Sequence, residues 1–357
     1  MEGVSVMLLL HRPPRGRGRR LRRAALVGLV VVVAAACVED LGSLGGPSTV
    51  AVDVNDSGVT VGYGVAADGV TRRAFRRQPG GTIVDIGGRF DQSEATAVNE
   101  AGVAVGFTTT GGVSDAVVWN AKGKLRSLEL GPDSQATDIA DDGTIVGHRG
   151  AQSASAGFVI DGATGEVETL PHAHPGVPQY VTAVNNHGDV VGYEYTAGYT
   201  PVLWQGPDHT PVVLPYFGGF VVPSDINDAG HIVGTDRFDG RLLASDAVWW
   251  RAGTHERVVL PAPPGGPLTS ADAINAAGEV VGSARPDRYT PGPERAVRWN
   301  INAVGPPTDL GDLGGESSGA RGVDSTGAAV GWAATEEVGP DGRPVIHAAR
   351  FPAPPEE

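Results

Sequence analysis

Apolar and polar residues alternate along the chain in short runs, and these runs recur at a nearly constant interval. The segment 51–62, AVDVNDSGVTVG, contains an alternating apolar run, a polar turn and a second apolar run. Related segments end at six further glycines: Gly106, Gly147, Gly192, Gly234, Gly282 and Gly331. Alternation over a few residues, bounded by turn residues, predicts paired β-strands. The sequence contains no useful length of helical periodicity, so we expect an all-β fold.

The polar centre of each segment is predicted to be a hairpin turn. Asparagine and glycine suit such a turn, because asparagine bonds its own backbone two residues on and glycine accepts a left-handed conformation. The asparagines are Asn55, Asn99, Asn185, Asn227 and Asn275, and the other two segments have Ala140 and Asp324 at this position. The turn glycines are Gly58, Gly102, Gly143, Gly188, Gly230, Gly278 and Gly327. We expect a structural role for all of these residues.

Two further signatures complete each repeat. A closing aromatic strand ends in Trp119, Trp204, Trp250 or Trp299, and Arg77, Ile160 and Phe351 hold that position in the other repeats. The motif Leu-Gly-x-Leu-Gly-Gly occurs at 41–46 and 310–315, with degenerate forms between. Each repeat is therefore predicted to contain four short strands: one before the turn, one after it, the aromatic strand and the leucine strand.

Seven such repeats of about 45 residues predict a seven-bladed β-propeller over 41–352, with 353–357 as a tail. Small residues seven positions before each turn glycine would let the inner strands crowd around a central channel. The alternative is an open solenoid, which usually needs polar caps at its ends. The sequence shows no caps, and the last repeat regains the full leucine motif of the first. A closed ring is therefore favoured.

The leucine motif, the turn motif Ala-x-x-Ile-Asn-x-x-Gly-x-x-Val-Gly and the closing aromatic strand together resemble the extracellular HAF-repeat family. The His-Ala-Phe triplet of that family is present only in altered forms, at 73–75 (RAF) and 347–349 (HAA). The resemblance spans about 41–352 and implies a secreted or surface-displayed repeat array with a propeller fold. It implies no established reaction, and no catalytic residue is assigned from it.

Residues 1–36 are predicted to be an export signal. A basic segment, 11–23, precedes a 13-residue apolar run, 24–36, which is too short for a membrane span. Three alanines directly before Cys37 look like a bacterial lipoprotein signal, in which that cysteine is lipidated and becomes the new N-terminus. We therefore expect an exported cell-surface lipoprotein anchored to the membrane through Cys37, with 37–40 as a short tether. A plain signal peptide and a secreted protein are the alternative.

Removing the leader makes the protein more acidic. The chain has 27 Lys and Arg against 41 Asp and Glu, and the leader holds seven Arg and one Glu, which leaves 20 against 40. A net charge of −20 disfavours nucleic acid as a partner, because phosphate binding depends on basic side chains. Cys37 is the only cysteine, so an intramolecular disulfide is excluded. We expect a monomer.

The candidates for metal binding are weak. Asp53 and Asp138 begin segments that resemble calcium loops, but Gly64 stands where such a loop needs a bidentate glutamate. With Asp225, they are the acidic residues five before the turn glycine, and in a channel they could gather a cation or polarise a sugar. His172 and His174 lack the third ligand that zinc requires. We expect no cofactor, and calcium stays an open alternative.

The candidates for ligand binding are aromatic and charged residues near the longer loops. The fifth to seventh repeats carry the longest insertions, and insertions in a repeat array map to one face, which is often the binding face. The candidates there are Arg285, Asp287, Arg288 and Tyr289. In the fourth repeat they are Tyr193, Tyr195 and Tyr199, which suit carbohydrate or protein contact but equally suit simple strand packing.

The sequence therefore favours a surface-anchored, non-catalytic repeat protein that binds a protein or a glycan through its loop-bearing face. One alternative is a propeller-based polysaccharide lyase or hydrolase acting at the central channel. The sequence contains no P-loop or dinucleotide-binding fingerprint to support an enzyme. Another alternative is a structural spacer without a dedicated ligand, since fold does not dictate function.

Overall fold

A computed structural model describes residues 37–237, 245–286, 292–303 and 305–355, which all belong to the larger of two units of the chain, 36–357. These residues form strands β1 to β28 and one short 3-10 helix, η1 (Gln152–Ala154). The all-β prediction is confirmed. The predicted leader, 1–36, lies outside the described residues, so its role as an export signal remains a prediction.

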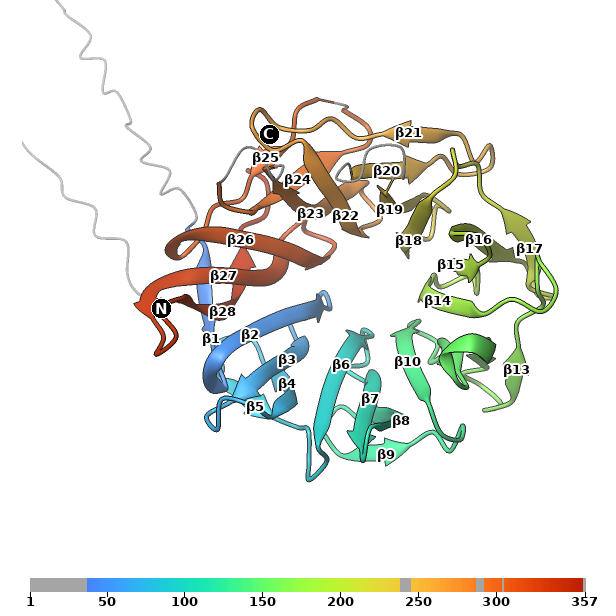
Figure 1. The fold of residues 1–357 in the computed structure, drawn as a ribbon, viewed down its shortest axis with the longest axis horizontal. Coiled ribbons are helices and arrows are strands. Elements are labelled where there is room, and N and C mark those ends of the chain that lie inside the picture. The colour runs from blue at the N-terminus through green and yellow to red at the C-terminus, as the bar shows by residue number, and fades with distance from the viewer. Residues whose placement is uncertain (1–36, 238–244, 287–291, 304, 356–357) are drawn as a thin grey trace, which may run out of the picture. The chain divides into compact units, whose positions relative to one another are not determined.

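The strands lie in four layers around a common centre, as in a propeller (Figure 1). The innermost strands are β2 (Gly45–Val54), β6 (Gln92–Val98), β10 (Ser134–Ile139), β14 (Gln179–Val184), β18 (Phe220–Ile226), β22 (Leu268–Ile274) and β26 (Gly314–Val323). The second layer comprises β3 (Thr60–Ala66), β7 (Ala104–Thr110), β11 (Ile145–Arg149), β15 (Val190–Tyr195), β19 (Ile232–Arg237), β23 (Glu279–Arg285) and β27 (Ala329–Val338).

The third layer contains the predicted aromatic strands: β4 (Arg72–Arg77), β8 (Val113–Trp119), β12 (Ala156–Ile160), β16 (Tyr199–Gln205), β20 (Asp246–Trp250), β24 (Arg295–Asn300) and β28 (Pro344–Phe351). The outermost strands are β5 (Ile83–Asp85), β9 (Leu125–Ser127), β13 (Val167–Thr169), β17 (Thr210–Val213), β21 (Arg257–Val259), β25 (Thr308–Asp309) and β1 (Glu39–Gly42). Consecutive layers pair antiparallel, which gives groups of four strands. We name each group after its innermost strand.

The β26 group takes its outermost strand from the other end of the chain. β1 pairs antiparallel with β28, with Glu39 opposite Arg350 and Asp40 opposite Ala349. The prediction that Glu39 and Asp40 belong to a tether is wrong, because both residues lie in β1. The leucine motif at 41–46 therefore begins in the last group of strands, whereas the rest of the first repeat forms the β2 group.

The two glycines of the repeated motif have different structural roles. The turn glycine has a positive φ, for example 76° at Gly58, as the sequence predicts. The final motif glycine lies opposite a β-bulge in the innermost strand, where a Cβ at Gly62 would stand 2.1 Å from the carbonyl oxygen of Val50. The equivalent glycines would clash in the same way, at 2.0–2.3 Å from a backbone oxygen. This second glycine is thus required by close approach of two strands.

The turn asparagines link neighbouring groups as well as shaping their own turns. Asn55 accepts a hydrogen bond from the Val59 amide through Oδ1 (2.9 Å) and donates through Nδ2 to the carbonyl oxygen of Asn99 in the next group (3.0 Å). The same two bonds recur at Asn99, Asn185, Asn227 and Asn275. All five residues are buried. The repeated asparagine therefore forms a chain of bonds around one end of the molecule.

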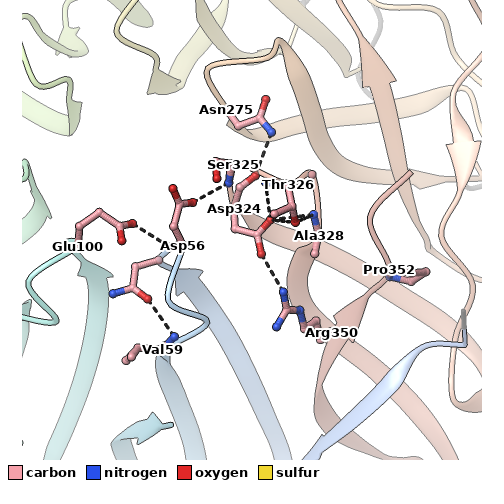
Figure 2. A network of polar contacts seen from close by, with 12 residues as sticks. Asp56, Val59, Glu100, Asn275, Asp324, Ser325, Thr326, Ala328, Arg350 and Pro352 are labelled. Atoms are coloured by element: carbon pink, nitrogen blue, oxygen red, sulfur yellow. Dashed lines mark hydrogen bonds and ion pairs between the residues drawn. The ribbon is translucent and has the colours of Figure 1, made fainter. Parts of the chain in front are cut away.

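Figure 2 shows how this chain of bonds reaches the first group again. Asn275 donates to the carbonyl oxygen of Asp324 (2.9 Å), whose carboxylate accepts from Ala328 N (2.9 Å) and from Arg350 (2.8 Å). The next residue, Ser325, donates its backbone N–H to Asp56 in the turn of the β2 group (2.8 Å). The departure from asparagine at position 324 thus supplies a buried carboxylate for the contact with Arg350 from β28.

The apolar core lies between neighbouring groups. One cluster joins Val61 and Ala74 of the β2 group to Val98, Val117 and Trp119 of the β6 group. The four tryptophans of the aromatic positions also donate their indole N–H groups backwards to a carbonyl oxygen of the preceding group, at 2.7–2.8 Å; the pairs are Trp119 with Ile86, Trp204 with Pro171, Trp250 with Pro215, and Trp299 with Pro261. A buried indole with a satisfied N–H contributes both packing and orientation.

Breaking one link of the asparagine chain should be costly. Asn227→Ala removes the bonds to His231 N and to the Asn275 carbonyl oxygen, and should lower the free energy of unfolding by about 2 kcal/mol. Ala140→Asn should supply the missing link and raise it by about 1 kcal/mol. Chemical denaturation tests both, with Asn120→Ala as the control because its side chain bonds only within its own turn. A loss of stability in Ala140→Asn would show that packing against Val146 excludes the larger residue.

Candidate functional site

A polar cavity of about 270 Å³ occupies the centre of the ring. The β-bulge lets two successive residues of an innermost strand face it, as with Val52 and Asp53, in every innermost strand except β26, which contributes Arg321 alone. The small residues that stand one position before these cavity-facing residues do not line the cavity. Instead they are buried in the core: Ala51, Ala95, Ala136, Val181, Pro223, Ala271 and Ala320. They allow close packing of the inner strands, as expected, but they face the neighbouring group.

The three predicted channel aspartates do meet in this cavity, and each joins two groups. Asp138 accepts hydrogen bonds from the amides of Ile139 in its own strand and Val184 in the next group, both at 2.8 Å. Asp53 and Asp225 make the equivalent pairs of bonds, at 2.7–2.8 Å, with Val54, Val98, Ile226 and Ile274. Both oxygens of each carboxylate are therefore engaged by backbone N–H groups.

Burial makes these carboxyls weaker acids than usual. It raises the pKa of Asp53 to about 7, of Asp138 to about 8 and of Asp225 to about 6, against the opposing effect of the backbone N–H bonds. Within the described ranges, no group of three or more His, Cys, Asp or Glu side chains is placed to hold a metal ion. The arrangement of the three aspartates fits a structural role in which each carboxylate links two neighbouring inner strands.

The predicted tyrosines of the fourth repeat form an open cleft. Tyr193, Tyr195 and Tyr199 line a pocket of about 620 Å³ together with Tyr180, Pro178, Gln152 and Ser153. The ring centroids of Tyr180 and Tyr193 are 5.2 Å apart with the planes at 19°, and those of Tyr193 and Tyr199 are 4.6 Å apart at 34°. The sequence left strand packing and ligand contact equally open, whereas the structure places these rings along an accessible cleft.

Two phenols of the cleft, those of Tyr180 and Tyr193, stay protonated over the ordinary pH range. Burial, followed by the neighbouring Tyr199 and Tyr180, raises the pKa of Tyr193 to about 12, and burial also raises the pKa of Tyr180. Tyr180 donates its hydroxyl to the Gln152 carbonyl oxygen (3.0 Å). Tyr195 is 49% exposed. The cleft thus presents aromatic rings with hydroxyl groups, and one ring reaches into solvent.

A buried glutamate that the sequence analysis missed supports the cleft. Glu194 lies between Tyr193 and Tyr195 in β15 with no exposed surface. It accepts from the amides of Ala173 (2.9 Å) and His174 (2.8 Å) and contacts the His174 ring at 2.8 Å. The two histidines considered for zinc therefore converge on a carboxylate that fixes their loop. Strand alternation, which turns residue 194 away from the tyrosines, was the available signal.

The other predicted residues are only partly placed. Arg285 lies at the exposed end of β23, while Asp287, Arg288 and Tyr289 fall outside the described residues. Cys37 is exposed and stands two residues before β1. Across the described ranges, no helix has the length and apolar character needed to span a membrane.

Comparison with known proteins supports the fold. No family model and no curated protein matches the chain. Among solved structures, it is similar to virginiamycin B lyase from Staphylococcus aureus, with 10% identity and a TM-score of 0.57 over 88% of this chain and 98% of that one. It is also similar to oligogalacturonate lyase from Vibrio parahaemolyticus, with 12% identity and a TM-score of 0.58 over 88% and 93%.

A third similar structure is the β-propeller domain of the Trilobed protease from Pyrococcus furiosus, with 11% identity and a TM-score of 0.50 over 83% of this chain and 93% of that one. That domain is described as having an open velcro topology. In the present chain β1 pairs with β28, so the first and last parts of the fold are joined by strand pairing. At these identities the likeness concerns fold alone, and it identifies this chain as a β-propeller protein.

Proposed function

We propose that the protein is a surface-displayed, non-catalytic glycan-binding propeller. Each four-stranded group is one blade of a closed seven-bladed ring, and the β1–β28 pair joins the first blade to the last. The ligand binds in the tyrosine cleft, on the face opposite the asparagine turns, where the loops between the second and third strands of each blade lie. The strand pairings and the repeated links between groups support this arrangement.

The tyrosine cleft is the observation that carries the glycan assignment. Its volume is within the usual range for small-ligand sites, and several aromatic rings converge on it. A sugar ring combines a face of C–H groups with a rim of hydroxyls, and a tyrosine matches it with an apolar face and one hydroxyl. Four tyrosines in contact could therefore hold several sugar units of a chain. A protein partner is the competing occupant of the same cleft.

We also propose that Cys37 anchors the protein to a membrane through lipid. The cysteine is exposed, and only one residue separates it from β1. Several acyl chains on one residue would give stable attachment. Such an anchor would hold the propeller close to the bilayer. Metabolic labelling with a fatty acid tests it, and label retained by Cys37→Ser would disprove the site.

Polysaccharide cleavage at the channel is the second candidate, because most of the residues that line the cavity are polar. Asp272 and Arg321 form an ion pair at its wall, with Nη1 and Oδ1 2.6 Å apart. A carboxylate beside a guanidinium could orient a sugar acid. The side chains of Asp53, Asp138 and Asp225, by contrast, are held by backbone N–H groups. Release of unsaturated or reducing sugar ends from bound polysaccharides would support this candidate.

Truncation of the cleft tyrosines should remove glycan binding. We expect Tyr195→Ala and Tyr199→Ala each to weaken binding by about 2 kcal/mol, or roughly thirtyfold, because central aromatic contacts dominate recognition. A glycan array followed by calorimetry on full-length protein in detergent measures this. Phe107→Ala is the matched control, since Phe107 follows the motif glycine of another repeat and lies outside the cleft. Unchanged glycan binding in both tyrosine variants would refute the assignment.

A further inference from the structure

A second pocket, lined by arginines, lies on the innermost and second strands of the β18 and β22 groups. It has a volume of about 240 Å³, and its charged lining comprises Arg237, Arg285, Arg321, Asp272 and Glu294. Hydroxyl groups of Ser270 and Ser283 contribute to the same wall, 3.1 Å apart. Basic and hydroxyl side chains together are the donor groups that an anionic ligand with several oxygens requires.

Two of the three guanidinium groups are available to a ligand. Arg321 is engaged by Asp272 at 2.6 Å, and Asp272 also accepts from Ser270 at 2.9 Å. Arg237 and Arg285 are exposed, and neither forms an ion pair with any residue that the structure describes. The pocket thus has three positive charges against two negative ones. This local excess is notable in a protein whose mature chain would carry a net charge of −20.

The arginine pocket and the tyrosine cleft lie on adjoining strands. Tyr199 of the cleft pairs with Phe220 across the junction between β16 and β18, and their ring centroids are 4.9 Å apart. Phe220 in turn lies opposite Arg237 in the β18–β19 pair. Arg237 is also close enough to Tyr193 to oppose the rise in its pKa that burial causes. Phe220 and Arg237 therefore connect the two pockets.

We infer that the two pockets are neighbouring subsites for one acidic oligosaccharide, whose sugar rings stack in the tyrosine cleft while its carboxylate groups bind Arg237 and Arg285. The inference rests on the proposed glycan-binding function and specifies its ligand class. A guanidinium can bind a carboxylate through two parallel N–H donors, which favours Arg over a simple point charge. A uronic acid supplies that carboxylate on the same ring that stacks.

The test compares three hexasaccharides, one of uronic acids, one neutral and one sulfated, by calorimetry on full-length protein in detergent. Arg237→Ala and Arg285→Ala should each weaken binding of the oligouronate about tenfold and leave the neutral sugar unaffected. Raising the salt from about 0.05 M to about 0.5 M should weaken only the charged ligands. Arg126→Ala, an exposed arginine on β9, is the matched control and should change nothing.

The outcomes separate this inference from the function on which it rests. If neutral and acidic sugars bind equally and only the tyrosine variants weaken them, the glycan-binding function stands and the arginine subsite is wrong. If no sugar binds, both fail. If the arginine variants matter but Tyr199→Ala does not, the two pockets are not subsites of one ligand. Tighter binding of the sulfated sugar would overturn the preference for carboxylates.

Discussion

Deletion of β1, residues 39–42, is expected to lower the melting temperature by about 10 °C. The strand contributes the buried side chain of Leu41, which packs in a cluster with Phe75 and Ala348. It also contributes an ion pair from Glu39 to Arg77 (2.7 Å) and a hydrogen bond between Asp40 and the His347 ring (2.9 Å). Loss of the leucine and of the strand hydrogen bonds should cost about 5 kcal/mol. In a domain of this size each kcal/mol shifts the melting temperature by about 2 °C.

Calorimetry on the deletion variant measures this effect, and two point variants separate the contributions of Leu41 and Glu39. Leu41→Ala should account for about half of the loss, since it empties a buried site. Glu39→Ala should cost about 1 kcal/mol, because its carboxylate is half exposed but the Arg77 side chain that it pairs with is buried and would lose that acceptor. A synthetic peptide containing β1 should restore part of the melting temperature of the deletion variant by mass action. An unchanged melting temperature after deletion would mean that the pairing with β28 does not stabilise the ring.

Replacement of all three channel aspartates should have a comparably large effect. Asp53→Ala, Asp138→Ala and Asp225→Ala each leave two backbone amides without an acceptor, at about 2 kcal/mol per site. The three sites share no hydrogen-bond partner, so the losses should add to about 6 kcal/mol. Alanine is the natural residue at the same position in the intervening groups, as at Ala97 and Ala183. The substitution therefore fits the strand geometry.

The same carboxyls should make stability depend on pH. Their pKa values are raised in the folded protein to between about 6 and about 8, whereas the unfolded chain has the ordinary value of 3.8. The folded state therefore holds more protons than the unfolded state between pH 3.8 and about 8. The contribution of these groups to stability is complete below that window and is lost as the pH rises through it.

Denaturation of the wild type and the triple variant at about pH 5 and about pH 8 tests the sign. The free energy of unfolding of the wild type should exceed that of the triple variant by more at the lower pH. The difference in free energy of unfolding between the two proteins cancels the contributions of the other titrating groups. Equal differences at both pH values would mean that the backbone N–H bonds keep the carboxylates ionised as readily as in water. Asp91→Ala, which removes an exposed carboxylate far from the cavity, is the control.

Much of the fold follows from local patterns in the sequence. Asn55 and Gly58 predict a turn because each residue type has a local conformational reason to occupy it. Alternation predicts the strands on both sides, and the repeated Trp119 position predicts a third. The pairing of β1 with β28 could not be predicted in this way, because it joins residues about 310 apart through backbone groups that carry no side-chain signature.

The candidate site was less predictable for a similar reason. Tyr193, Tyr195 and Tyr199 are adjacent in sequence, and their grouping is visible, but Tyr180 joins them only through strand pairing. Arg237 and Arg321 lie in different repeats and meet at one pocket only when the groups pack side by side. The cavity lining could not be predicted from the repeated motif either, because a bulge rather than simple alternation turns Asp53 and its neighbour toward the centre.

The pairing of β1 has a consequence for the order of folding. β1 is synthesised before any other strand, yet its partner β28 is synthesised last, and 307 residues separate Asp40 from His347. Contacts of such high sequence separation form late and slow the approach to the native state. A chain interrupted anywhere before β28 leaves Leu41 exposed to water. Burial of that one leucine therefore indicates that synthesis has reached the final strand. A protease that acts on exposed N-terminal segments would remove incomplete chains first.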